Sequence, residues 1–150
     1  MGKNAEERIP FMRIMAIDYG DAHTGVAISD PTGFLAGFTT VINAYRPEAV
    51  AEQISALAKE HGVEELVLGH PINMDGTRGP RSEKAQAMKA LLEETTSLPV
   101  TLWDERRTTI DAHQILMNSG KNAKKRKKVV DAVAATLILE GYLTYKKSHQ

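Results

Sequence analysis

The chain has 150 residues, 42% of them hydrophobic and 25% charged, which suffices for one compact domain with its own core. It contains no cysteine, which excludes disulfides and thiolate zinc sites and suits a reducing cytoplasm. No apolar run approaches the roughly 20 residues of a membrane span, and no signal-peptide pattern opens the chain, so we expect no membrane partner. The net charge is zero, yet from Thr101 onward ten Lys and Arg outnumber five Asp and Glu. Such asymmetry indicates either a polyanionic partner or a solvated charged run.

The first part of the chain predicts an antiparallel meander followed by a helix. Residues 1–12 are polar and aperiodic, and we expect a flexible leader there, ahead of a single domain over 13–147. Pro47 is a good first helical residue, and Gly62 can end that helix in a left-handed conformation. Three short apolar runs separated by turn signals predict antiparallel strands over 13–18, 24–29 and 34–42.

The remainder of the chain alternates short strands with helices. Each of its two strands follows a helix, and helical crossovers imply parallel pairing. We therefore predict an α/β fold, a mixed five-stranded sheet with three antiparallel strands, then two parallel ones, and helices on both faces. The predicted elements are strands over 65–69 and 99–103 and helices over 82–95, 108–117 and 129–145.

Two isolated acids fall where α/β proteins place ligands. Asp18 ends the first strand, at the edge where open sheets bind ligands, although an aspartate there can also cap a turn with Gly20. Asp131 is the only charged residue between Lys128 and Glu140. Burying a lone carboxylate is costly unless a cation or hydrogen-bond donors compensate it, so the alternatives are a metal ion and a buried salt bridge.

A third acid follows the fifth strand, where Asp104 and Glu105 are neighbours. Consecutive strand residues point to opposite faces, so one of the two should face Asp18, and spacing alone does not choose between them. Carboxylates of this kind hold Mg²⁺ or Mn²⁺, and two such ions can activate water and steady the leaving oxygen in phosphodiester hydrolysis. The acids therefore predict a metal-dependent hydrolase that cuts nucleic acid.

Two polar segments are candidates for contacts with nucleic acid. The basic run at 121–128 lies directly before the predicted helix of Asp131, where phosphate contacts would position a substrate. The loop at 69–81 offers polar donors but lacks the ending of a Walker loop. A solvated charge run and a well-capped turn are the alternatives. His70 and His113 lack metal-ligand spacing, and we expect both to be structural. The predicted nucleic-acid-binding residues are Lys124, Lys125, Arg126, Lys128, Arg106, Asn73 and Thr77.

Four blocks of sequence resemble the YqgF family, relatives of the RuvC Holliday-junction resolvases. The resemblance implies a ribonuclease-H-like fold and a nuclease that trims the 5′ end of precursor 16S ribosomal RNA. It also implies an acidic site of Asp18, Glu105 and Asp131, and so favours Glu105 over Asp104. The blocks are Asp-Tyr-Gly-x-x-x-Thr-Gly-Val-Ala at 18–27, Gly-x-Pro-x-Asn-Met-Asp-Gly-Thr at 69–77, Asp-Glu-Arg-x-Thr-Thr at 104–109 and Val-Asp-x-x-Ala-Ala-x-x-Ile-Leu-Glu at 130–140.

The chain departs from that family pattern at two places. His23 stands where the family usually has Lys or Arg, and Gly69 and His70 stand where RuvC resolvases carry a further acid. An ordinary His is mostly uncharged at neutral pH, which weakens any phosphate contact from the first hairpin. The expected partner is structured RNA or branched DNA, bound by a monomer or homodimer. The alternatives are a Holliday junction resolvase, a non-catalytic nucleic-acid-binding module, and a sugar-kinase-like phosphotransferase, which needs two such lobes.

Overall fold

The computed structural model of this chain describes residues 13–30, 36–72, 76–105 and 123–148, and within the last range it describes side chains from 132 onward. The predicted leader at 1–12 and the predicted helix at 108–117 lie outside the described residues. In chain order, the described elements are β1 (Ile14–Asp18), β2 (His23–Ser29), β3 (Ala36–Asn43), α2 (Pro47–His61), β4 (Glu65–His70), α3 (Pro80–Thr96), β5 (Val100–Asp104) and α5 (Ala123–Ser148).

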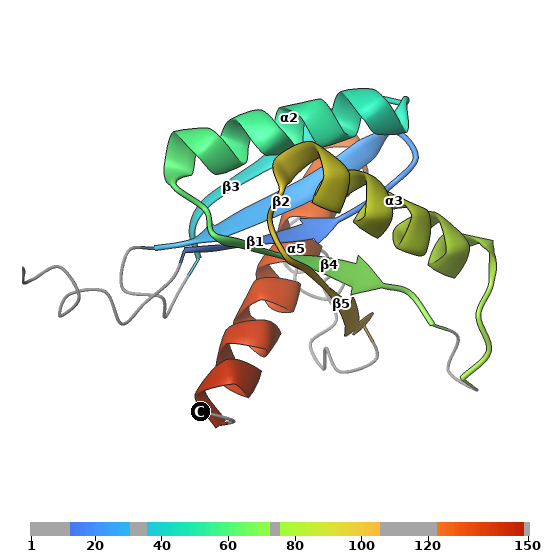
Figure 1. The fold of residues 1–150 in the computed structure, drawn as a ribbon. Coiled ribbons are helices and arrows are strands. Elements are labelled where there is room, and N and C mark those ends of the chain that lie inside the picture. Colours follow the sequence, from blue (N-terminus) through green and yellow to red (C-terminus); the bar gives the residue numbers. More distant parts are fainter. Residues whose placement is uncertain (1–12, 31–35, 73–75, 106–122, 149–150) are drawn as a thin grey trace, which may run out of the picture.

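The five strands form one mixed sheet in the order β3-β2-β1-β4-β5 (Figure 1). The first three strands pair in antiparallel fashion, whereas β1 pairs in parallel with β4, and β4 with β5. This arrangement confirms the predicted sheet. It also brings the carboxyl ends of β1, β4 and β5 to the same edge, because parallel neighbours end together.

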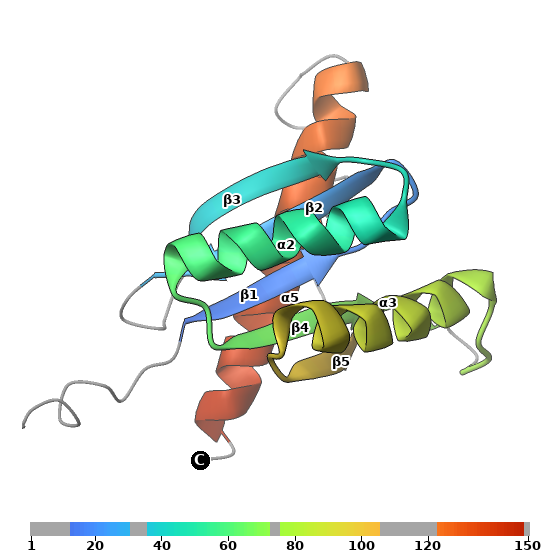
Figure 2. The ribbon, with the colours of Figure 1, turned by 45° about the horizontal axis from the view of Figure 1, so that its top comes forward.

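The helices cover both faces of the sheet, as predicted. Helices α2 and α3 lie on one face and α5 crosses the other (Figures 1 and 2). Alternate residues of β1 divide between the two cores, because successive strand side chains point to opposite faces. Met15 and Ile17 pack in the core beneath α2 and α3, and Ile14 and Ala16 pack against α5. By the same alternation, Asp18 falls on the α5 side.

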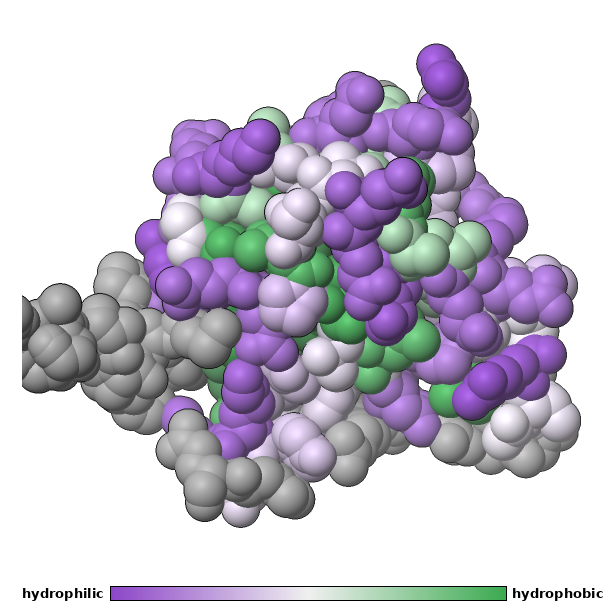
Figure 3. All heavy atoms as spheres, in the orientation of Figure 1, coloured by the Kyte–Doolittle hydropathy of each residue, from purple (hydrophilic) through white to green (hydrophobic). Residues whose placement is uncertain are grey.

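The surface on the side of the molecule seen in Figure 3 is mostly hydrophilic, with some hydrophobic side chains showing near the middle of the view. Helix α2 has the predicted bounds, with Pro47 in its first turn and Gly62 beyond its last. Gly62 has φ of 67° and ψ of 37°, the left-handed conformation that a glycine adopts at low cost. Within the described residues, no helix combines the length and apolar character that a membrane span requires.

The predicted starts of two helices are wrong. Helix α3 begins at Pro80 and not at residue 82, because a proline fixes a helical φ and needs no hydrogen-bond acceptor in the first turn. Helix α5 begins at Ala123 and not at residue 129, so that the basic run does not precede the helix but forms its first turns. Lys and Arg are good helix formers, which explains why the charged segment continues the helix.

A buried acid holds the carboxyl-terminal half of α5 on the sheet. Glu65 at the start of β4 is 7% exposed, and it accepts hydrogen bonds from the Tyr142 hydroxyl and from Lys146 Nζ, the latter at 2.8 Å. The Tyr142 ring also meets the edge of Trp103, with 5.7 Å between ring centroids. Burial, followed by the hydrogen bond to Glu65, raises the pKa of Tyr142 to about 12.

The Tyr142 hydroxyl is expected to contribute stability that alkali removes. An unfolded tyrosine ionises near pH 10, so the contribution is complete below that pH and disappears as the pH rises toward 12. Tyr142→Phe should lower the free energy of unfolding by about 1–3 kcal/mol at pH 8, because Glu65 loses a donor, and this difference should shrink above pH 10. Urea unfolding across this pH range is the measurement, with Tyr45→Phe at an 80% exposed tyrosine as the control. A constant difference up to pH 12 would contradict the expectation.

Candidate active site

The first predicted acid lies at the end of a central strand. Asp18 is the last residue of β1 and is half-buried. It pairs with Gly25 of β2 on one side, and on the other side β1 pairs with β4 up to the Ile17–Leu68 pair. The next residue of β4 is Gly69, so the edge of the sheet beside Asp18 carries no side chain.

The second predicted acid, Glu105, follows β5 and extends to the position of Gly69. Trp103 packs in the core under α5, so alternation places Asp104 on the opposite face and Glu105 on the α5 side. A Cβ built on Gly69 would lie 2.5 Å from Glu105 Oε2, which shows that the Glu105 carboxylate lies directly over the Gly69 backbone. Glycine leaves this space open, whereas any other residue would bring a Cβ into the space and force the carboxylate to move.

The position over Gly69 brings the Glu105 carboxylate toward Asp18. Neighbouring strands are about 4.8 Å apart, and β4 lies between β1 and β5. A carboxylate that covers β4 is therefore roughly one strand spacing from the end of β1, although the two backbones are two spacings apart. Glu105 and Asp18 thus share the α5 side of the sheet, and Asp104 does not.

Among the described residues, the charge of Glu105 is poorly compensated. Burial raises the pKa of its carboxyl group, Arg81 at the start of α3 opposes this, and Asp104 adds to it. The neighbouring cation therefore does not offset the loss of hydration. A carboxylate in such surroundings would gain from a further positive charge within contact distance.

The third predicted acid lies on α5. Position 131 precedes Ala135 by four residues and Ile138 by seven, and these two residues are buried against the sheet. Residues at this spacing share one side of a helix, so position 131 falls on the side of α5 that faces the sheet. The side chain of Asp131 lies outside the described part. Among the side chains that are described, no three His, Asp or Glu residues are close enough together to hold an ion.

The two described histidines near the site have hydrogen-bonded, structural surroundings. His70 is 6% exposed on the α3 side of β4, and its Nε2 lies 2.6 Å from Ser82 Oγ. Burial lowers the pKa of His70, with Arg78 acting in the same direction, which favours the neutral ring. His23 Nδ1 lies 2.7 Å from Asn43 Oδ1 at the start of β2.

The predicted nucleic-acid contacts are only partly described. Thr77 is exposed in the segment before α3. Asn73 and Arg106 lie outside the described residues. The remaining four are in the first turns of α5, where the backbone is described and the side chains are not: Lys124, Lys125, Arg126 and Lys128.

The fold is of the ribonuclease-H-like class, and comparisons with known proteins identify the family. The RuvX family model, described as Holliday junction resolvase, matches residues 12–145. A Halothermothrix orenii protein named "Putative pre-16S rRNA nuclease" is 46% identical over 135 residues, which cover 90% of this chain and 96% of that protein. A Pelotomaculum thermopropionicum protein of the same name is 44% identical over 133 residues, covering 88% of this chain and 86% of the relative. The chain belongs to the RuvX (YqgF) family.

A solved structure supports the same fold. RuvC of T. thermophilus in complex with a Holliday junction substrate superimposes with a TM-score of 0.61, covering 90% of this chain and 96% of that chain. The sequences are 14% identical, so this likeness concerns the fold alone. It confirms the predicted ribonuclease-H-like arrangement of strands and helices.

Sequence reasoning missed the role of Gly69. The motif that begins at this glycine was visible, and a glycine that ends an apolar strand often marks a close approach. The sequence did not show which group approaches Gly69, because the carboxylate belongs to Glu105, 36 positions later in the chain.

Gly69→Ala should be destabilised because the Glu105 carboxylate and the end of the Ile138 side chain would have to move. The new methyl group would meet Glu105 Oε2 at 2.5 Å and Ile138 Cδ1 at 2.8 Å. We expect a loss of about 1–3 kcal/mol in the free energy of unfolding, typical of an overpacked site. The double variant Gly69→Ala with Glu105→Ala should recover at least about 0.5 kcal/mol beyond additivity, since shortening Glu105 removes one of the two contacts. Additive losses in urea unfolding would show that Glu105 does not occupy this space.

Proposed function

We propose that this protein is a metal-dependent nuclease that hydrolyses phosphodiester bonds near the 5′ end of precursor 16S ribosomal RNA. The observation that supports it most is the Glu105 carboxylate, which crosses β4 above Gly69 toward Asp18. The substrate is inferred from the names of the relatives, which cover nearly the whole chain. The chemistry is inferred from the acids themselves.

The acids suit a divalent ion with a preference for oxygen. Asp18, Glu105 and Asp131 would hold Mg²⁺ or Mn²⁺, because these ions take carboxylate oxygens, water and substrate phosphate as ligands. Glu105 is the acid whose surroundings support a bound cation, since burial raises the pKa of its carboxyl group and the neighbouring Arg81 does not offset this. When bound, the metal would activate water and stabilise negative charge that develops on the phosphate.

The residues of the chain itself would orient the substrate and confine the site. The Glu105 carboxylate lies over the Gly69 backbone, and the Cδ1 atom of Ile138 of α5 lies close to the same position. A carboxylate that already lies over the central strand needs little rearrangement to act at the edge of the sheet. Apolar residues of β1, β4 and α5 pack on this side of the sheet, and apolar surroundings strengthen electrostatic interactions at its edge.

The first turns of α5 support a role in phosphate binding. Five Lys or Arg residues occupy 124–128, and the helix has no acid in its first turn. Cations are unfavourable at the amino end of a helix, where the helix dipole is positive. A cluster that is unfavourable for the helix is better explained by a polyanionic ligand that compensates the charge.

Resolution of branched DNA is the second candidate, favoured by the description of the family model. The acids would perform the same hydrolysis on either polymer, so substrates decide between the two. A precursor 16S fragment and a four-way DNA junction should be compared under identical conditions with Mg²⁺ or Mn²⁺. Faster cleavage of the junction would overturn the proposed RNA substrate and leave the nuclease proposal intact.

Glu105→Gln should lose at least about a hundredfold in cleavage rate, because the amide is a poor ligand for a divalent ion. Asp104→Asn is the matched control, since Asp104 points to the opposite face and should lose only a few-fold. Mg²⁺ should also raise the melting temperature of the parent and of Asp104→Asn, but not of Glu105→Gln. Equal losses of activity in the two variants would sink the assignment of Glu105.

Neutralising Lys124, Lys125 and Arg126 together should weaken binding of both RNA and DNA. Phosphate binding releases counterions, so the slope of log affinity against log salt should flatten by roughly 0.7–0.9 for each phosphate that the variant no longer neutralises. The measurement is fluorescence polarisation with labelled oligonucleotides in EDTA at several salt concentrations. The sequence preference should not change, since phosphate contacts carry no direct base information. An unchanged salt slope would identify the run as a solvated surface.

A further inference from the structure

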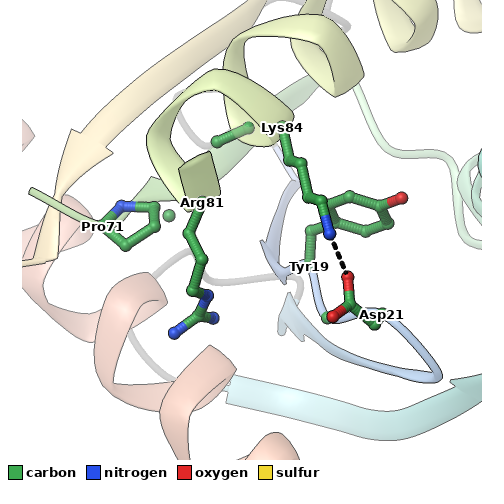
Figure 4. A pocket seen from close by; sticks show the side chains of 8 residues that line it. Tyr19, Asp21, Pro71, Arg81 and Lys84 are labelled. Carbon is green, nitrogen blue, oxygen red and sulfur yellow. Dashed lines mark hydrogen bonds and ion pairs between the residues drawn. The ribbon is translucent and has the colours of Figure 1, made fainter. Parts of the chain in front are cut away.

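A small pocket opens next to the acids, on the α3 side of the sheet edge. Its volume is about 130 Å³, and the side chains that give it its chemistry are Tyr19, Asp21, Arg81 and Lys84 (Figure 4). The first two come from the turn between β1 and β2, and the basic pair comes from the first turn and a half of α3. The pocket thus combines two cations with one carboxylate at the carboxyl ends of β1 and β4.

The charges in this pocket favour an anion. Lys84 Nζ lies 2.8 Å from Asp21 Oδ1, and this hydrogen bond lowers the pKa of Asp21. An ammonium group has three donors, so Lys84 can keep Asp21 and still donate to a ligand. Among the described residues, no carboxylate forms an ion pair with Arg81. The pocket therefore has a net positive charge and a planar guanidinium suited to the oxygens of a phosphate group.

A second pocket of about 280 Å³ adjoins the first and shares Tyr19, Asp21 and Lys84 with it. Its other wall contains Tyr45, which lies between β3 and α2 and is 80% exposed. Leu91 of α3, which is half-buried, lines it as well and supplies an apolar surface. An exposed aromatic ring beside basic side chains is the usual combination for binding unpaired nucleotides, because the base stacks and the phosphate is neutralised.

The pockets and the acids lie along one edge of the sheet. Gly69 lines the first pocket and also receives the Glu105 carboxylate on its α5 side. Arg81 influences the pKa of both Glu105 and Asp21, so its guanidinium lies within electrostatic range of the acids and of the pocket. A strand with one phosphate in the pocket would therefore pass the acids within a short distance.

We propose that the two pockets bind one unpaired nucleotide of the substrate strand, with its phosphate on Arg81 and Lys84 and its base against Tyr45. The proposal rests on the nuclease function and deepens it, since it specifies a single-stranded segment beside the cleaved bond. A paired base could not offer its face to Tyr45, because stacking within the helix covers that face. Asp21 limits the affinity by competing with the phosphate for Lys84.

Binding without cleavage tests the proposal. Fluorescence polarisation in EDTA should compare an RNA hairpin bearing a single-stranded tail with a blunt hairpin of the same stem. Arg81→Gln with Lys84→Gln should weaken binding of the tailed RNA about tenfold and flatten its salt slope by about 0.7. Tyr45→Ala should also weaken it about tenfold, whereas Tyr45→Phe should bind like the parent because the stacking ring remains. Neither Tyr45 variant should alter binding of the blunt hairpin.

The ion pair between Asp21 and Lys84 provides a further test, and a second ion pair on α3 provides its matched control. Asp21→Asn should tighten binding of the tailed RNA a few-fold, because Lys84 is released for the phosphate. Glu93→Gln removes an equivalent carboxylate from Lys89, whose ion pair at 2.8 Å lies outside both pockets, and it should have no effect. Equal weakening of tailed and blunt hairpins by Tyr45→Ala, or no effect of Asp21→Asn, would overturn the pocket assignment.

Cleavage assays distinguish failure of the pocket assignment from failure of the proposed nuclease function. If the parent cuts RNA with Mg²⁺ while the pocket variants bind the tail normally, the nuclease stands and the nucleotide site is wrong. If the parent neither binds nor cuts any tested nucleic acid, both proposals fail together. A titration with inorganic phosphate, followed by the backbone amide signals of Asp21 and Ala85, adds a direct reading. Shifts that are saturable in the parent and absent from the double variant would support the site, and unchanged signals would overturn it.

Discussion

The close approach of the Glu105 carboxylate to the backbone of Gly69 governs the geometry of the sheet edge. Parallel pairing of β1, β4 and β5 aligns their ends, but it leaves the first and third strands two spacings apart. A side chain on the middle strand would fill that gap. Its absence at Gly69 lets the Glu105 carboxylate cover β4 and approach the end of β1, where Asp18 lies.

Contacts of α5 at the other end of the same sheet face help to keep this arrangement in place. Helix α5 is fastened at the far end of β4 by Glu65, which Tyr142 and Lys146 both contact. The Cδ1 atom of Ile138, one turn earlier in the helix, lies beside the Glu105 carboxylate. The helix that carries position 131 therefore also forms one wall of the space around Glu105. A shift of α5 would move both at once, so the packing of the helix and the geometry of the acids are coupled.

The sequence predicted the sheet, the covered faces and the position of Asp18, because these follow from periodicity, turn residues and the crossover rule. It did not place the start of α5, since a run of cations reads as a loop although each residue is a good helix former. The choice between Asp104 and Glu105 rested on family resemblance, and the backbone geometry now places Glu105 on the Asp18 side. The pairing of Asp21 with Lys84 joins residues 63 positions apart, and no local pattern could have shown it.

Arg81 links the two sides of the sheet edge electrostatically. It lowers the pKa of Glu105 against the effect of burial, and it also lowers the pKa of Asp21 in the pocket. A phosphate bound by Arg81 would neutralise this guanidinium and withdraw its support from Glu105. The carboxylate of Glu105 would then depend more strongly on a divalent ion for its charge balance. Occupation of the pocket by a phosphate and binding of a metal ion at the acids should consequently favour each other. The phosphate neutralises the positive charge that supports Glu105, and the metal ion supplies a positive charge in its place.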